Sequence, residues 1–151
     1  MKTLLKSTLF VTSLCCLIIN LANAEDGVIY KTESGINFVS GGVSEEQASD
    51  IRHNAKNFSL HLLFSAGSAG GWLTDVSVLI IDGSGQTAFI KRQAGPLLYI
   101  DLPAGDYQVI GRYNDVRQSK RLTLRGEKPQ RVILNWKDET GDDAENSKQE
   151  E

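Results

Sequence analysis

The chain has 151 residues, with 16 lysines and arginines against 19 aspartates and glutamates, which gives a net charge of −3. This length suits one domain, and the near balance of charge gives no overall bias towards nucleic acid. Cys15 and Cys16 lie in an apolar run near the start, and no other cysteine follows. The rest of the chain can form no disulfide, so it must be held together by an apolar core.

Residues 1–24 have the pattern of a secretory signal peptide. Lysines precede an apolar run, and residues 22–24, Ala-Asn-Ala, supply the small side chains before a cleavage site. The run is shorter than the roughly 20 apolar residues of a membrane-spanning helix. A lipoprotein is the alternative, but Leu14 precedes Cys15 where a small residue is expected. We therefore predict cleavage after Ala24, no transmembrane segment afterwards, and a periplasmic location, with secretion as the alternative.

Two segments flank the main domain in the prediction. Residues 25–57 form an N-terminal segment, in which Ser44 followed by Gln47 is a capping box for a short helix. We expect this helix to run from Glu45 to about Asn54 and to cover one end of the domain. Residues 137–151 contain seven acids, two lysines and no large apolar side chain, which predicts a disordered acidic tail.

Residues 58–136 show the period-two alternation of short strands. Within the stretch from Gly95 to Tyr113, apolar residues alternate on both sides of a Leu-Pro-Ala-Gly-Asp turn at 102–106. Tyr107, directly after this turn, is expected to form a tyrosine corner with its hydroxyl bound to the backbone. Counting from Phe58 gives about seven strands. The sequence therefore predicts an all-β fold, a single antiparallel seven-stranded Greek-key β-sandwich of the prealbumin-like or immunoglobulin-like kind, with one short N-terminal helix.

Two stretches carry a resemblance to a known family. Residues 75–85 read Asp-Val-Ser-Val-Leu-Ile-Ile-Asp-Gly-Ser-Gly, and residues 102–109 read Leu-Pro-Ala-Gly-Asp-Tyr-Gln-Val. Together they resemble the carboxypeptidase regulatory-like domain, although the Thr-Asp-x-x-Gly run that usually precedes the turn is missing. The resemblance, over about residues 57–136, implies a prealbumin-like (transthyretin-like) fold in a small exported bacterial protein. It carries over no catalytic residues.

The sequence predicts no catalytic residues, no metal site and no cofactor. His53 and His61 are its two histidines, and a closed zinc site would need carboxylates from distant loops. We expect His61 at the surface. The transthyretin-like fold also hosts a hydrolase of purine degradation, but that enzyme's motifs are absent here. A binding or accessory module is therefore predicted, with a hydrolase of unrecognised site or a structural component of an envelope assembly as alternatives.

The candidate binding residues are Arg112, Arg121, Arg131 and Trp72. Residues 107–136 carry seven basic and two acidic side chains. If the last three strands are neighbours, the three arginines share one outer face that attracts an anionic glycan, a lipid head group, an envelope protein or the acidic tail itself. The alternative is a solvated face whose charge prevents edge aggregation. Trp72 follows a glycine-rich loop, where its ring either stacks on a sugar or plugs one end of the sandwich.

Overall fold

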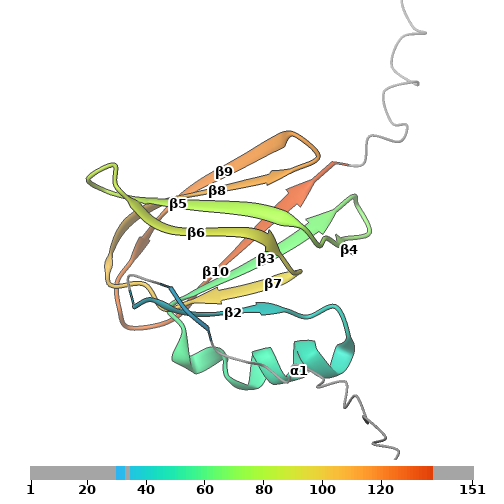
Figure 1. Cartoon of the computed structure of the whole chain (residues 1–151), viewed down its shortest axis with the longest axis horizontal. Helices are drawn as coiled ribbons and strands as arrows, with labels where there is room; N and C mark the ends of the chain where they lie inside the picture. The colour runs from blue at the N-terminus through green and yellow to red at the C-terminus, as the bar shows by residue number, and fades with distance from the viewer. Residues whose placement is uncertain (1–29, 33–34, 138–151) are drawn as a thin grey trace, which may run out of the picture.

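The computed structural model describes residues 30–32 and 35–137, so the predicted signal peptide and nearly all of the acidic tail lie outside the described residues (Figure 1). The described residues fold into two β-sheets and one α-helix. In chain order the elements are β1 (Tyr30–Lys31), β2 (Asn37–Gly41), α1 (Glu45–His53), the 3-10 helix η1 (Ala55–Asn57), β3 (Leu60–Ala66), β4 (Gly71–Trp72), β5 (Val76–Asp82), β6 (Thr87–Ala94), β7 (Leu97–Ile100), β8 (Gly105–Tyr113), β9 (Val116–Leu124) and β10 (Gln130–Trp136).

The prediction of an all-β fold with one short helix is confirmed, but its strand pattern is not. Within the described residues, one sheet has the order β1-β2-β7-β3-β10, with β4 paired to the end of β3. The other sheet has the order β6-β5-β8-β9. The seven predicted strands correspond to β3 and β5 to β10, while β1, β2 and β4 add to the first sheet. The pairing is also not purely antiparallel, because β10 lies parallel to β3.

The parallel pair has a topological cause that alternation in the sequence does not encode. The β8–β9 hairpin belongs to the four-stranded sheet, and the chain then crosses to the other sheet to form β10. There it meets β3, about 70 residues earlier, with Gln130 opposite Leu60 and Trp136 opposite Ala66. Such a parallel pair needs a long connection, whereas the hairpins expected from the sequence join neighbours antiparallel. The N-terminal segment is part of the same sheet, since β2 pairs with β7.

The main core lies between the two sheets. Leu60 and Ile100 face each other across β3 and β7, and both are fully buried. Val109 on β8 and Trp136 on β10 contribute from the two sheets, and the predicted core position of Trp136 is confirmed. Alternating side chains that point inward from both sheets are what hold a β-sandwich together.

The predicted tyrosine corner at the start of β8 is confirmed. The Tyr107 hydroxyl donates to the Pro103 carbonyl oxygen at 2.9 Å. Burial of the phenol raises the pKa of Tyr107 above its ordinary value of 10.0, and the negative charge of Asp82 raises it by a smaller amount. The bond ties the turn at 102–106 to the first residues of β8 and so fixes how the chain passes from one sheet to the other.

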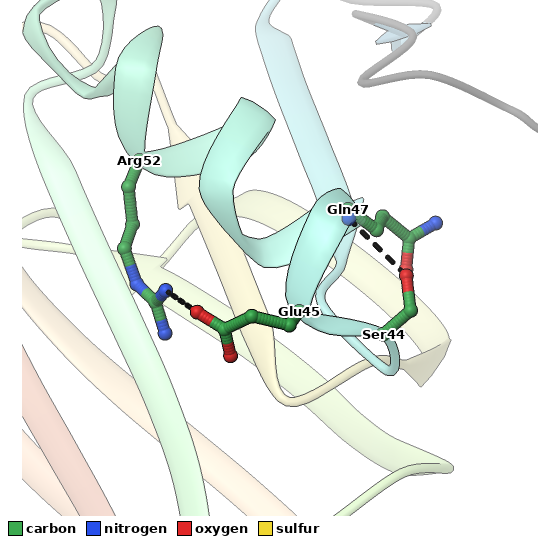
Figure 2. A network of polar contacts seen from close by, with 4 residues as sticks. All are labelled: Ser44, Glu45, Gln47 and Arg52. Carbon is green, nitrogen blue, oxygen red and sulfur yellow. Dashed lines mark hydrogen bonds and ion pairs between the residues drawn. The ribbon is translucent and has the colours of Figure 1, made fainter.

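Helix α1 begins as predicted but lies in a different place. The Gln47 backbone N–H donates to the Ser44 hydroxyl at 3.2 Å, which caps the first turn (Figure 2). The Gln47 side chain completes the cap by accepting from the backbone N–H groups of Gly42 and Val43 instead of that of Ser44. The helix was expected to cover one end of the sandwich. It lies instead along the outer face of the β2-β7-β3 sheet (Figure 1), where apolar side chains form a second core.

This second core explains the position of the helix. Ala48 and Ile51 are the buried residues of α1. They pack with outward-pointing apolar residues of β2 and β7, Val39, Leu97 and Tyr99. Leaving such side chains exposed would cost about 1.5–3 kcal/mol for each large one. The amphipathic helix therefore covers the sheet whose outer side is apolar.

Candidate binding face

Two of the four predicted binding residues lie on one face of the four-stranded sheet. Arg112 on β8 and Arg121 on β9 are both exposed, and their strands pair antiparallel. Arg131 lies on β10, in the other sheet, so the expectation that it shares this face is wrong. The cause is the crossover after β9, because a period-two pattern gives a residue's face but not its sheet. Trp72, on β4, also belongs to the six-stranded sheet.

The alternation of β8 directs its arginine outward. Val109 and Gly111 are buried against the core, which places Ile110 and Arg112 on the opposite side of the strand. Gly111 lets core side chains pack directly on the strand, because a Cβ atom there would lie 2.8 Å from the Leu134 Cδ1 atom and 3.0 Å from the Trp136 Cη2 atom. The inward side of β8 is thus filled by the core of the sandwich, and its outward side is left to polar and partly exposed residues.

The β8–β9 hairpin adds Arg117 to this face, which the sequence analysis did not place there. Asn114 and Asp115 have φ values of 44° and 63°, as in a tight two-residue hairpin turn. The turn sets a register in which Arg112 lies directly opposite Arg117. Strand β9 begins before the predicted Gln118. Extending the period-two pattern back along the strand would have found Arg117.

Apolar side chains lie between these charges. We call this outer surface of the four-stranded sheet the open face. A cross-strand row runs from Ile90 through Leu79 and Ile110 to Ser119. Ile90 is 59% exposed, and Leu79 and Ile110 are partly exposed. The residues that make up the open face are Ser77, Leu79, Ile81, Ile90, Asp106, Gln108, Ile110, Arg112, Arg117, Ser119, Arg121 and Thr123.

The arginines of the open face have no acidic partner in the part of the chain that the structure describes. There the single ion pair within 4.0 Å joins Arg52 to Glu45 on helix α1 (Figure 2). Arg112 and Arg117 instead face each other, and like charges directly opposite on antiparallel strands are unfavourable. The rung that they form is therefore a concentrated positive site beside the β8–β9 turn.

Two hydrogen-bonded carboxylates lie at the opposite end of the same sheet. The Asp106 carboxylate accepts a hydrogen bond from the Thr123 hydroxyl at 2.5 Å. The Asp82 carboxylate accepts from the Ser84 hydroxyl and from the Gln86 backbone N–H, and these bonds hold the pKa of Asp82 below its ordinary value of 3.8. Both carboxylates lie at the end of the sheet where the β5–β6 turn is, several register positions from the Arg112–Arg117 rung. Asp75 and Asp115 lie at the other end, near the Arg112–Arg117 rung, so each end of the four-stranded sheet carries two carboxylates.

An open hollow of about 470 Å³ lies at the end with Asp82 and Asp106. Its walls include Asp82, Asp106 and Gln108, with Arg121 on β9. A guanidinium beside two carboxylates gives this hollow mixed charge, unlike the rung of two arginines at the other end. The strongest positive site of the open face is therefore the Arg112–Arg117 rung, while Arg121 lies near Asp82 and Asp106 at the other end.

The outer face of the six-stranded sheet is organised differently around Arg131. Its register partner on β3, His61, stacks on Tyr99 with ring centroids 4.1 Å apart. The His61 Nε2 atom lies 2.9 Å from the Ala55 carbonyl oxygen and 3.2 Å from that of Phe58. His61 is thus partly buried and held against η1, not at the surface as expected. We call this surface the covered face.

Tyr99 is the buried titratable group of the covered face. Its ring is 6% exposed and also contacts Phe58. Burial raises the pKa of Tyr99 above its ordinary value of 10.0, while the positive charges of Arg52 and Arg131 act in the opposite direction. Arg131 therefore acts on the helix-covered side of the molecule, and its surroundings are those of a structural cluster.

Trp72 lies near the same side and contacts helix α1. Its side chain is 49% exposed, so it does not plug the end of the sandwich. The Arg52 guanidinium carbon lies 5.4 Å from the centroid of the indole ring, a cation–π arrangement that the sequence did not indicate. Since Arg52 also pairs with Glu45, one side of the ring is already in contact with an ion-paired arginine.

Neither a metal site nor a membrane span is found in the part of the chain that the structure describes. No group of three or more histidine, cysteine, aspartate and glutamate side chains there is placed to hold a metal ion. None of the helical segments among these residues is long and apolar enough to cross a membrane. A scan against models of known protein families finds no match, and a search among curated proteins finds no similar sequence.

Proposed function

We propose that this protein is an exported, non-catalytic binding module whose open face binds a polyanionic component of the cell envelope. The observation that carries the proposal is the difference between the two outer surfaces of the sandwich. Helix α1 covers the β2-β7-β3 part of the outer face of the six-stranded sheet and leaves Ile133 on β10 50% exposed, whereas no helix or strand of the described residues covers any part of the open face. The open face combines exposed arginines with the apolar row of exposed Ile90 and partly exposed Leu79 and Ile110.

The chemistry of the Arg112–Arg117 rung favours an anionic ligand. Two arginines without an acidic partner repel each other across the strand pair, and an anion bound between them removes this repulsion. Guanidinium groups bind carboxylates and phosphates through paired hydrogen bonds. Arg121 lies four residues further along β9 on the same side, so a ligand with several negative groups gains more than a single ion.

Fold and location form part of the same proposal. The strands β3 and β5 to β10 divide into one group of three and one of four, which supports a seven-stranded prealbumin-like unit related to the carboxypeptidase regulatory-like domain. The signal-peptide pattern of residues 1–24 supports export to the periplasm. The intact mass of the protein from the periplasmic fraction is expected to match a chain that begins at Glu25. A mass that retains residues 1–24 contradicts export with cleavage.

The binding test compares two sets of arginine and lysine replacements that remove equal charge. The first variant carries Arg112→Gln, Arg117→Gln and Arg121→Gln on the open face. The control variant carries three replacements elsewhere, Arg125→Gln, Lys128→Gln and Arg131→Gln. Each protein is titrated with vesicles that contain anionic lipid and, separately, with a soluble sulfated glycan.

We expect the first variant to lose binding and the control to keep most of it. Binding of the unmodified protein should weaken between low and physiological ionic strength, because salt screens the attraction between the arginines and the ligand. Near physiological salt, charges more than about 8–10 Å apart are largely screened. The two titrations identify whether lipid head groups or glycan supply the anions. Equal loss in both variants indicates attraction by net charge alone and contradicts a defined face, as does binding that does not respond to salt.

A further inference from the structure

We propose that residues 138–151 of the same chain occupy the Arg112–Arg117 end of the open face when no external polyanion is bound. The segment would then act as an internal competitor for that site. This inference names a segment of the chain itself as a ligand of the open face. The contact needs no external ligand, so it can be tested separately from the proposed function. It follows from where the described chain ends, from the register of the β8–β9 hairpin and from the charges of the segment.

The last strand brings the chain to the same end of the sandwich as the tip of the β8–β9 hairpin, on the inward side of that hairpin. The Trp136 Nε1–H donates to the Val116 carbonyl oxygen at 2.9 Å. Its ring also contacts Tyr113, with centroids 6.2 Å apart. Tyr113 and Val116 are the residues that flank the β8–β9 turn, so β10 ends beside the tip of that hairpin (Figure 1). Lys137 is the last described residue and follows directly.

The arginine rung is one register position away from this exit point, on the outer side of the hairpin, so the segment would reach it by passing around the edge strand β9. Tyr113 pairs with Val116, and the adjacent rung of the hairpin is the pair of Arg112 and Arg117. The 14 residues from 138 to 151 span at most about 50 Å when fully extended. The distance along β9 from Arg117 to Arg121 is about 13 Å for four residues. The segment is therefore long enough to pass along all three arginines of the open face.

The charges of the two partners are complementary. The open face has arginines with no acidic partner among the described residues. The segment contains Lys148 and the seven acids Asp138, Glu139, Asp142, Asp143, Glu145, Glu150 and Glu151. Because the segment is joined to the domain, its effective concentration at the face is in the millimolar range typical of short tethers. Weak, screened attraction is enough to populate a contact at that concentration.

Other charges near the exit point limit where the segment can bind. Asp115 lies exposed on the β8–β9 turn and reduces the attraction at its tip. Lys120, Arg125 and Lys128 are also exposed and are alternative sites for an acidic segment. The Arg112–Arg117 rung is favoured over these single cations because it presents two guanidinium groups directly opposite each other, next to the point where the segment begins.

The experiment follows the guanidinium N–H signals of individual arginines by NMR in the full chain at low ionic strength. One variant neutralises the segment with Asp142→Asn, Asp143→Asn and Glu145→Gln. A matched control changes three uncharged residues of the same segment, Thr140→Ser, Asn146→Gln and Gln149→Asn. We expect the signals of Arg112 and Arg117 to shift in the neutralised variant and to stay in place in the control.

Salt and dilution measurements separate this inference from binding at another cation and from binding between two copies of the chain. High salt should move the signals of the unmodified protein towards those of the neutralised variant, while the signal of Arg52, paired with Glu45, stays in place. Unchanged Arg112 and Arg117 signals overturn the inference, as do shifts confined to Arg125. Shifts that vanish on dilution mean that the segment of a second copy binds, which also overturns it.

The same variants show whether the proposed function fails independently. If the segment competes with an external polyanion, the neutralised variant should bind the sulfated glycan several-fold more tightly than the control. If the signals shift but no polyanion binds, the internal contact stands and the proposed function fails. If a polyanion binds through the three arginines but the NMR signals do not change in the neutralised variant, the proposed function stands and the internal contact fails.

Discussion

The covered face and the open face are the two outer surfaces of one sandwich, and both carry apolar side chains. On the covered face, Leu97 and Tyr99 point outward and are almost fully buried, because α1 supplies Ile51 against them. On the open face, Ile90 and Ile110 point outward from the other sheet and keep part of their surface in solvent. The difference is not the presence of apolar residues but whether a second layer packs on them.

The surroundings of the apolar residues differ in the same way. Polar groups of the covered face have internal partners, as His61 does with the carbonyl oxygens of Ala55 and Phe58. On the open face, Arg112 and Arg117 have each other as nearest cross-strand neighbours. A buried polar group needs a partner to avoid a desolvation cost, whereas an exposed charge is satisfied by water. The covered face therefore contributes stability, and the open face is free to contribute binding.

The largest expected effect comes from matched isoleucine truncations on the two faces. Ile51→Ala removes a side chain that is 1% exposed and leaves a cavity under α1, so we expect the free energy of unfolding to fall by about 2–5 kcal/mol. Ile90→Ala removes a side chain that is 59% exposed, and we expect a change of about 0.5 kcal/mol or less. Urea denaturation measures both. Similar losses would mean that the open face is packed against another part of the protein.

The sequence was sufficient for the elements that depend on local chemistry. The Ser44 cap, the turn at 102–106 with Tyr107 after it, and the inward positions of Ile100 and Trp136 all follow from residue type and period. These features depend on a few consecutive residues, so a single sequence contains the information for them.

The features that the sequence did not reveal depend on which strands become neighbours. The crossover that separates Arg131 from Arg112, and the parallel pairing of β10 with β3, join residues far apart in the chain. A period of two gives the two sides of a strand but neither its partner nor its sheet. The partial burial of His61 also depends on a neighbour, because its ring nitrogen contacts the carbonyl oxygens of Ala55 in η1 and of Phe58 directly after it. The candidate binding face was therefore only partly predictable.

A smaller effect is expected from removing one charge of the arginine rung. Arg117→Gln ends the repulsion with Arg112 on the opposite strand, so at low ionic strength we expect the free energy of unfolding to rise by about 0.2–1 kcal/mol. Added salt should reduce the gain, since it screens the repulsion. Arg125→Gln, in an exposed turn with no arginine opposite, is the control. A loss of stability in Arg117→Gln would show that this arginine supports the fold.

The smallest effect concerns the Tyr99 phenol and appears only at alkaline pH. Because burial raises the pKa of Tyr99 above 10.0, the folded protein holds this proton more tightly than the unfolded chain does. The associated stability is fully present below pH 10 and is lost as the pH rises through the raised pKa. We therefore expect the free energy of unfolding to fall with pH above 10, and Tyr99→Phe to make this fall less steep.

Ultraviolet titration of tyrosinate provides the direct measurement. Tyr107 also has a raised pKa, so the unmodified protein should show late-titrating tyrosine absorbance, and Tyr99→Phe should remove part of it. The positive charges of Arg52 and Arg131 oppose the effect of burial, so replacing either by glutamine should raise the pKa of Tyr99 further. Replacing Arg112 on the open face should leave it unchanged, because that residue lies in the other sheet. A response of Tyr99 to Arg112 but not to Arg131 would contradict the assignment of these arginines to different faces.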